Sequence, residues 1–150
     1  MAGMAEGMRA AIEEAGRAGE RGEVPIGAAV VFNGAVIARA GNQTIALSDP
    51  TAHAEMLAIQ EAGQKLGSQR MADTDLYVTL EPCTMCAAAI SFARVRRLYF
   101  GASDEKGGAV ENGVRFFSQP SCNHAPEVYG GMAASEAAAL LRRFFALRRA

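Results

Sequence analysis

The sequence predicts an α/β fold in which a central mixed five-stranded sheet lies between two layers of helices. Its 150 residues match the usual length of one domain, so we expect residues 1–150 to form a single unit. Apolar segments with the period of a strand alternate with segments that have the period of a helix. An Asn-Gly pair joins the first two strand-like segments, and a hairpin makes those strands antiparallel. These observations predict a three-layer α/β/α domain with a mixed sheet.

The first half of the chain is predicted to contain a helix, a hairpin and a second helix. Asn33-Gly34 separates the two strand-like runs of the hairpin. Asp49-Pro50 then stops the chain from continuing as a strand, and a helix follows in which we expect Met56, Leu57 and Ile59 to face inward. The predicted elements cover residues 4–19, 26–32, 35–40 and 52–66.

The second half is predicted to contain three strands and two helices. Glu81-Pro82 ends the third strand of the sheet, and Cys83 follows that strand directly. Sites in such sheets gather at the carboxyl ends of strands. The loop over residues 102–126 is long for a compact domain, which favours a functional role. In order, strand, helix, strand, strand and helix are expected over residues 75–80, 83–93, 97–101, 127–130 and 135–148.

The composition is that of an ordinary globular protein. Half of the residues are hydrophobic and 21% are charged, which excludes a disordered chain. No apolar run approaches the roughly 18 residues needed to cross a bilayer, so we expect a cytoplasmic protein with no membrane partner. The net charge is −1, but residues 91–150 hold 9 Lys and Arg against 5 Asp and Glu. This basic part suits contact with phosphates, or it forms only a solvated surface.

Two of the three cysteines lie close together as Cys83-x-x-Cys86. In a reducing compartment this spacing indicates metal or redox chemistry before a disulfide framework. Cysteines three residues apart on a helix share one face, and the amino end of a helix favours the thiolate that binds zinc. The third cysteine, Cys122, has no predicted role.

The cysteine pair belongs to a larger pattern. His53-Ala54-Glu55 opens one predicted helix and Pro82-Cys83-Thr84-Met85-Cys86 opens another, a combination typical of zinc-dependent nucleobase deaminases. His53, Cys83 and Cys86 are three protein ligands, which leaves the fourth tetrahedral position to water as in catalytic sites. We therefore expect one zinc ion per chain. The alternative is a closed structural site whose fourth ligand is His124, Cys122 or a carboxylate.

Glu55 is the predicted catalytic residue. It lies two residues from His53, near the metal without having to bind it. Zinc lowers the pKa of a bound water to about 7, and a carboxylate at this place can take the water proton and pass it to the substrate. The alternative for Glu55 is a solvated carboxylate on a helix surface.

Beyond the zinc pattern, the chain resembles the bacterial tRNA-specific adenosine deaminases over nearly its whole length. These enzymes belong to the cytidine and deoxycytidylate deaminase superfamily. The zinc pattern identifies the superfamily, and the flanking blocks indicate the member. The blocks are Val24–Ala28, Asn42, Asp49–Glu55, Tyr77–Cys86, Arg97–Ala102, Asp104–Ala109, Asn123-His124 and the C-terminal Leu-Leu-Arg-Arg-Phe-Phe segment.

The resemblance implies a cytidine-deaminase-like fold, a homodimer, and hydrolysis of adenosine to inosine at the wobble position of a tRNA anticodon. It also implies that the anticodon stem-loop of tRNA is the partner. Asn42 is similar to the residue that contacts the target nucleoside, Asp104 and Asn123 match positions near the anticodon loop, and Phe144 and Phe145 border it. Asn42 and Asp104 could instead form turns, and the phenylalanines could pack in the core.

Two other functions use the same residues. A free-base deaminase acting on guanine or cytosine would have the same metal site on the same fold, and only its loops would differ. A non-catalytic zinc module should lack the glutamate or close the metal site. The chain also differs from some tRNA-specific adenosine deaminases: those members have Arg-Pro at the place where this chain has Gln43-Thr44.

A feature independent of the resemblance also favours a dimer. The run Ala87-Ala88-Ala89-Ile90 lies beside Phe92, and small side chains allow two helices to approach closely. A tightly packed core within one chain would use these residues equally well.

Overall fold

The computed structural model describes residues 2–149. The elements alternate along the chain much as the sequence predicts, and each predicted boundary lies within two residues of the observed one. The short helix η1, inside the long loop before β5, was not predicted. In chain order they are α1 (Ala2–Glu20), β1 (Gly27–Phe32), β2 (Ala35–Gly41), α2 (Ala54–Leu66), β3 (Thr74–Leu80), α3 (Thr84–Ala93), β4 (Arg97–Ala102), η1 (Phe116–Ser118), β5 (Glu127–Tyr129) and α4 (Ala134–Arg149).

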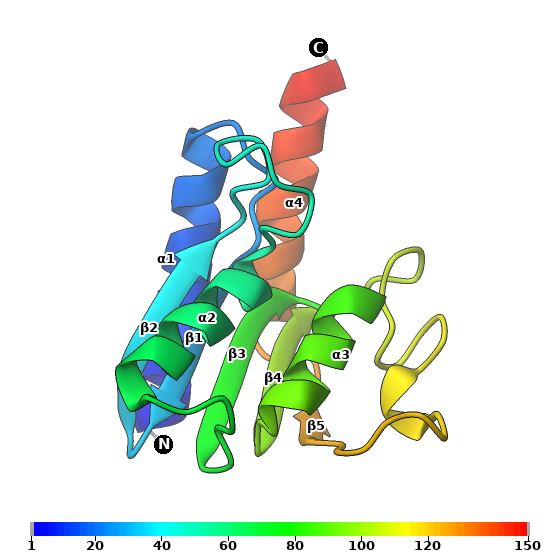
Figure 1. Ribbon diagram of the computed structural model, residues 1–150. Coiled ribbons are helices and arrows are strands. Elements are labelled where there is room, and N and C mark those ends of the chain that lie inside the picture. The colour runs from blue at the N-terminus through cyan, green and yellow to red at the C-terminus, as the bar shows by residue number, and fades with distance from the viewer. Residues whose placement is uncertain (1, 150) are drawn as a thin grey trace.

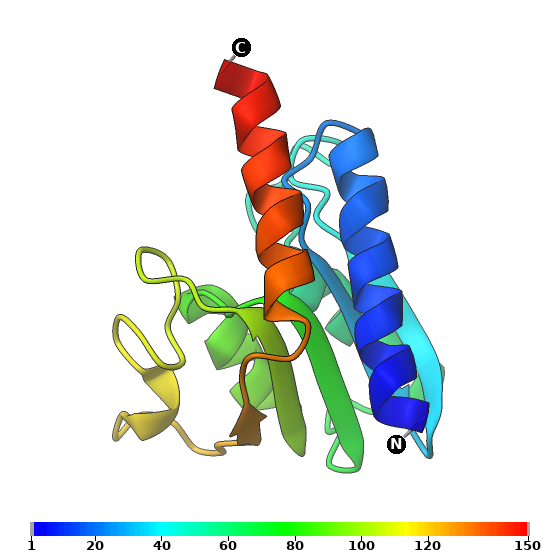
Figure 2. The same cartoon turned by 180° about the vertical axis from the view of Figure 1, so that it is seen from behind.

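The five strands form one mixed sheet in the order β2-β1-β3-β4-β5. β1 is antiparallel to both β2 and β3, whereas β3, β4 and β5 are parallel to one another. α2 and α3 cover one face of the sheet, and α1 and α4 cover the other (Figures 1 and 2). The predicted three-layer α/β/α fold with a mixed five-stranded sheet is confirmed.

The hairpin between β1 and β2 follows from its turn residues. Asn33 and Gly34 both have positive φ, at 53° and 77°, as the two-residue turn that best matches strand twist requires. β1 and β2 then pair from Gly27 opposite Gly41 to Phe32 opposite Ala35. This pairing places the end of β2 beside the start of β1.

Each face of the sheet carries its own apolar cluster. Leu76 and Val78 of β3 pack with the α2 and α3 side, and Tyr77 between them packs with α1, because side chains alternate along a strand. The expectation that Met56, Leu57 and Ile59 face inward is confirmed for one of them: all three are partly buried, and of these Ile59 packs against the core. The fully buried side of α2 consists of small residues, which let the helix lie close to the sheet: Ala54, Ala58 and Ala62.

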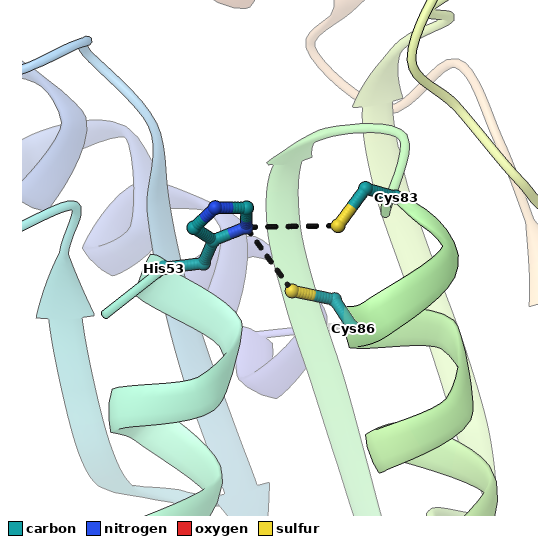
Figure 3. Close-up of side chains that lie close together, drawn as sticks. All are labelled: His53, Cys83 and Cys86. Carbon is teal, nitrogen blue, oxygen red and sulfur yellow. Dashed lines mark hydrogen bonds between the residues drawn. The ribbon is translucent and has the colours of Figure 1, made fainter. Parts of the chain in front are cut away.

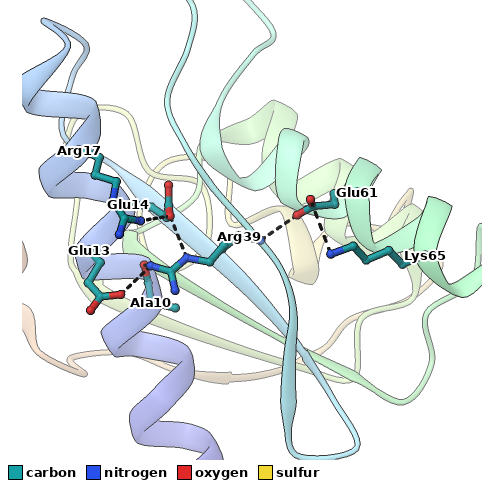
Figure 4. Close-up of polar contacts among 7 residues, drawn as sticks. All are labelled: Ala10, Glu13, Glu14, Arg17, Arg39, Glu61 and Lys65. Carbon is teal, nitrogen blue, oxygen red and sulfur yellow. Dashed lines mark hydrogen bonds and ion pairs between the residues drawn. The ribbon is translucent and has the colours of Figure 1, made fainter.

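Side chains of α2 cap the outer edge of the sheet at β2 (Figure 4). Glu61 accepts a hydrogen bond from the backbone N–H of Arg39 at 3.0 Å, and Lys65 donates to the carbonyl of Ile37 at 2.6 Å. The guanidinium of Arg39 contacts Glu14 on α1 at 2.8 Å. Exposed edge strands invite pairing with other chains, so these contacts both protect β2 and join it to two helices.

Three strands stop at the same edge of the sheet. β2, β3 and β4 end at the same edge, where β1 begins, and the last turns of α4 project past it (Figures 1 and 2). The loops after β2, β3 and β4 therefore meet at this edge.

Among the described residues, no helix has the length and apolar character needed to span a membrane.

Candidate functional site

The candidate site forms where α2 and α3 begin. His53 is the residue that precedes the first turn of α2, and Cys83 holds the same position before α3. Both have extended backbones, with φ of −73° and −75°, so their side chains lie at the amino ends of the two helices. Cys86 follows one turn into α3 and is fully buried. Helix amino ends favour negative charge, including thiolates.

The three side chains converge on one point (Figure 3). Nδ1 of His53 lies 3.6 Å from the sulfur of Cys83 and 3.5 Å from that of Cys86. A nitrogen about 2.1 Å and a sulfur about 2.3 Å from a tetrahedral zinc ion are about 3.6 Å apart, so both distances fit. No fourth His, Cys, Asp or Glu of the described residues joins the group. The donor set therefore suits one zinc ion with a coordination position left for water.

The two thiols respond differently to this arrangement. A hydrogen bond from Cys86 lowers the pKa of Cys83 to about 5, with help from the backbone N–H of Cys86 and from His53. The same contact, together with burial, raises the pKa of Cys86. One sulfur is thus ready as a thiolate, and a bound cation would displace the proton of the other.

Glu55 lies in the first turn of α2 and is only 4% exposed. Burial raises the pKa of its carboxyl to about 7, and the negative charge of Cys83 adds to this effect. Glu55 is not one of the clustered ligands. It is therefore a carboxyl beside the cluster rather than part of it.

The same four residues lie within a segment that matches a known protein family. A model of the cytidine and deoxycytidylate deaminase zinc-binding region matches residues 2–102, a span that includes the three clustered side chains and Glu55. The chain belongs to this deaminase family. Zinc is the family's metal, which agrees with the fit of the donor set.

Individual relatives narrow the comparison. The tRNA-specific adenosine deaminase of Agrobacterium fabrum is 65% identical over 95% of this chain and 93% of its own. A solved structure from work on A-to-I editing by tRNA:A34 deaminases at the wobble position of transfer RNA is 64% identical, with a TM-score of 0.90 over 91% of this chain and 99% of its own. The guanine deaminase of Bacillus subtilis is 29% identical, with a TM-score of 0.66 over 97% and 94%. The deaminase described here thus resembles the first two far more.

Asn42 lies in the loop that leads from β2 to His53. The backbone N–H of Gln43 donates to the carbonyl of Ala52 at 3.0 Å, which ties this loop next to His53. Asn42 is 6% exposed, and its Oδ1 has no hydrogen-bond partner among residues 2–149. Buried polar atoms are nearly always paired, so a polar group of a ligand would satisfy this one.

Asp104 lies in the loop after β4, at the same edge of the sheet. Its Oδ1 accepts the backbone N–H groups of Lys106 at 3.2 Å and Gly107 at 2.9 Å. This oxygen forms a turn, as one of the two interpretations of the sequence expects.

The remaining predicted contacts lie in the loop before β5 and on α4. Asn123 is exposed, and its neighbour His124 places Nε2 2.8 Å from the carbonyl of Val95, beyond the carboxyl end of α3. On α4, Phe145 is 40% exposed and the guanidinium of Arg148 lies 4.2 Å from the ring centre of Phe144. Neither His124 nor Cys122 joins the cluster of His53, Cys83 and Cys86.

Two acidic residues of the deaminase were missed by the sequence analysis. Glu23 and Glu81 are each only 2% exposed. The carboxylate of Glu23 accepts the backbone N–H groups of Ile45 and Ala46 in the loop before His53. Glu81 follows a buried strand and precedes a proline, a pattern that marked the end of the strand but not a buried acid.

Proposed function

We propose that this deaminase hydrolyses adenosine to inosine, with release of ammonia, at the wobble position of a tRNA anticodon. The observation that carries the chemistry is the three-ligand cluster with a separate buried carboxyl beside it. The choice of substrate is supported by the 65% identity to a tRNA-specific adenosine deaminase over almost the whole chain.

In this proposal His53, Cys83 and Cys86 hold one zinc ion through Nδ1 and the two sulfurs. When bound, zinc supplies Lewis acidity that makes water a nucleophile near neutral pH. The side chains that would hold the ion are themselves fixed, because each lies at or next to the first turn of a helix.

Glu55 moves the protons. Its carboxylate accepts the proton that the attacking water loses and delivers it to a ring nitrogen while the C6–oxygen bond forms. The carboxylate then takes the remaining proton of the new C6 hydroxyl group, which becomes a carbonyl, and passes it to the amino group, which leaves as ammonia when the C6–nitrogen bond breaks. Its pKa of about 7 suits a group that must both accept and donate near neutral pH.

The RNA contacts in this proposal come from the family resemblance. The free Oδ1 of Asn42 accepts a hydrogen bond from the target nucleoside. Asp104 meets the anticodon loop beside the site, while Asn123, Phe144 and Phe145 meet nucleotides farther from it. An unpaired anticodon base suits such an enzyme, because most of the cost of flipping a base out of a duplex is avoided.

The test compares an anticodon stem-loop carrying a wobble adenosine with free adenine, guanine and cytosine. We expect ammonia release from the stem-loop to be far faster, because contacts remote from the reacting atom orient the target. Phosphate contacts should make this rate fall with rising salt, whereas hydrolysis of a neutral free base should hardly change. A stem-loop with guanosine at the wobble position is the matched control. Faster release from guanine or cytosine, without a salt effect, would contradict the tRNA assignment and favour a free-base deaminase.

We also propose a homodimer in the cytoplasm, where ligand thiols stay reduced. Phe92 on the outer side of α3 is 74% exposed and borders a groove of about 520 Å³ between α2 and α3. Part of the small-residue run, Ala87 and Ile90, is buried in the core, but Ala89 lines this groove. An apolar groove with a protruding aromatic side chain suits a second copy of the same face.

A further inference from the structure

The loop that follows β4 is wrapped around a single buried carboxylate, that of Glu81. Oε1 accepts the backbone N–H of Asp104 at 3.0 Å and the side-chain amide of Asn112 at 2.7 Å. Oε2 accepts the backbone N–H groups of Val110, Glu111 and Asn112 at 3.1, 2.9 and 3.0 Å. Hydrogen bonds to an ionised acceptor are about twice as strong as neutral ones. Five such bonds fix both ends of the segment 104–112.

The loop packs closely against this carboxylate. A Cβ at Gly108 would lie 2.5 Å from the carboxyl carbon of Glu81 and 2.5 Å from the carbonyl oxygen of Asp104. The next residue, Ala109, donates its backbone N–H to the carbonyl of Pro82 at 2.9 Å. The backbone therefore packs directly against Glu81-Pro82.

The position of Glu81 links this loop to the metal cluster. The backbone N–H of Glu81 donates to the carbonyl of Ala102 at the end of β4. Cys83, a member of the metal cluster, follows Glu81 by two residues and directly precedes α3. One short segment thus carries a predicted zinc ligand and holds the loop that contains Asp104. A displacement of the carboxylate would move the loop relative to the reacting base.

We propose that Glu81 is a positioning residue that holds the 104–112 loop in register with the zinc cluster, so that the loop can meet the RNA beside the target adenosine. The part that concerns RNA rests on the proposed function. Glutamine keeps the shape of the side chain but puts an NH₂ group where one carboxylate oxygen accepts backbone N–H groups. Glu81→Gln should therefore loosen the loop at one end or both without removing a zinc ligand.

The first measurement is amide hydrogen exchange of the zinc-loaded protein. In Glu81→Gln we expect the amide of Asp104, the amides of Val110, Glu111 and Asn112, or both sets to exchange about tenfold faster or more, depending on which carboxylate oxygen the NH₂ group replaces. Glu23→Gln is the matched control, since it alters an equally buried carboxylate that holds a different loop. It should accelerate exchange at Ile45 and Ala46 and leave Asp104 and residues 110–112 unchanged. Unchanged exchange at both Asp104 and residues 110–112 in Glu81→Gln would overturn the proposal.

The second measurement separates positioning from a purely structural role. With a full complement of zinc in Glu81→Gln, KM for the stem-loop should rise about tenfold while kcat stays within about twofold, because the loop contributes to binding. Asn112→Ala, which removes only one of the donors, should shift KM the same way by a smaller factor and serves if Glu81→Gln does not fold. Loss of zinc, or a fall in kcat at constant KM, would overturn the proposal. Absence of stem-loop turnover in the unaltered protein would instead refute the proposed function, and the exchange data would still test the anchoring.

Discussion

The nitrogen and the two sulfurs of the cluster lie at distances that already match the edges of a zinc tetrahedron. The cluster comes from residues 30 positions apart in the chain, His53 and Cys83, each placed at a helix start. Each of these side chains is therefore held in place by a rigid element of the fold. We therefore expect the zinc content of the protein to depend on each of the three side chains.

Removing a ligand should remove zinc. We expect about one zinc ion per chain in the unaltered protein and little in His53→Ala, Cys83→Ser or Cys86→Ser, because two ligands hold the ion far more weakly than three. Cys122→Ser is the matched control, since Cys122 contacts Ser91 and the backbone of His124 rather than the cluster. Elemental analysis of the purified proteins gives the answer. Full zinc in all three ligand variants would refute the ligand assignment.

Glu55 should be separable from the metal. Glu55→Gln keeps the size of the side chain but cannot carry the proton, so turnover should fall by about 10²- to 10⁴-fold. Zinc content and thermal unfolding should stay close to those of the unaltered protein, because Glu55 is not among the clustered ligands. Single-turnover deamination of the stem-loop measures the effect. Activity within a few-fold of normal would show that another group moves the protons.

At the scale of elements, α1 packs unusually close to the sheet. A Cβ at Gly27 of β1 would lie 1.9 Å from the carbonyl oxygen of Ala11 in α1. This contact is possible only because glycine has no side chain. The sheet carries a matching glycine on the next strand, Gly41, opposite Glu14. Besides the apolar contacts that α1 makes with Tyr77, this close approach therefore depends on two glycine positions of the sheet.

Gly27→Ala should lower the free energy of unfolding by about 2 kcal/mol or more, since overpacking typically costs about 1–3 kcal/mol and the obstacle here is backbone. Gly16→Ala in α1 is the control, because nothing lies within 4 Å of its added Cβ. That change should be neutral or stabilise by up to about 1 kcal/mol. Denaturant unfolding of both variants measures the difference. Equal stability of the two would show that α1 can move away from the sheet without cost.

At the scale of the whole molecule, the most exposed large apolar side chain among the described residues is Phe92 at 74%. It lies on the α2 and α3 side of the domain, which α1 and α4 do not cover. Leu147 near the end of α4 is almost as exposed, at 72%, but lies elsewhere on the surface. These two residues provide a matched pair for testing which surface self-associates.

Light scattering at micromolar concentration should give twice the 15.7 kDa mass of one chain. Phe92→Asp should shift the mass toward that of the single chain, because a charge in an apolar interface is costly. Leu147→Asp should leave the dimer intact. A single-chain mass for the unaltered protein would refute the homodimer, and dissociation by Leu147→Asp alone would place the interface on α4 instead.

The sequence by itself determined the order of elements, the mixed sheet and the zinc pattern. These features depend on local chemistry: Asn33-Gly34 forms a hairpin turn, and His53 and Cys83 lie where helices begin, whatever surrounds them. The blocks of sequence around the zinc pattern led to the proposed substrate, because the side chains in the loops distinguish one deaminase of the family from another.

Only the tertiary structure decided which residues share an environment. It buried the alanine side of α2 rather than Met56, because the closeness of the sheet and not hydrophobicity alone selects the inner face. It also left Phe145 exposed on α4, a helix whose last turns extend beyond the end of the sheet. The anchoring of the 104–112 loop on Glu81 was invisible for the same reason. Its donors lie more than 20 residues away along the chain, and a charge becomes a buried anchor only when a folded backbone surrounds it.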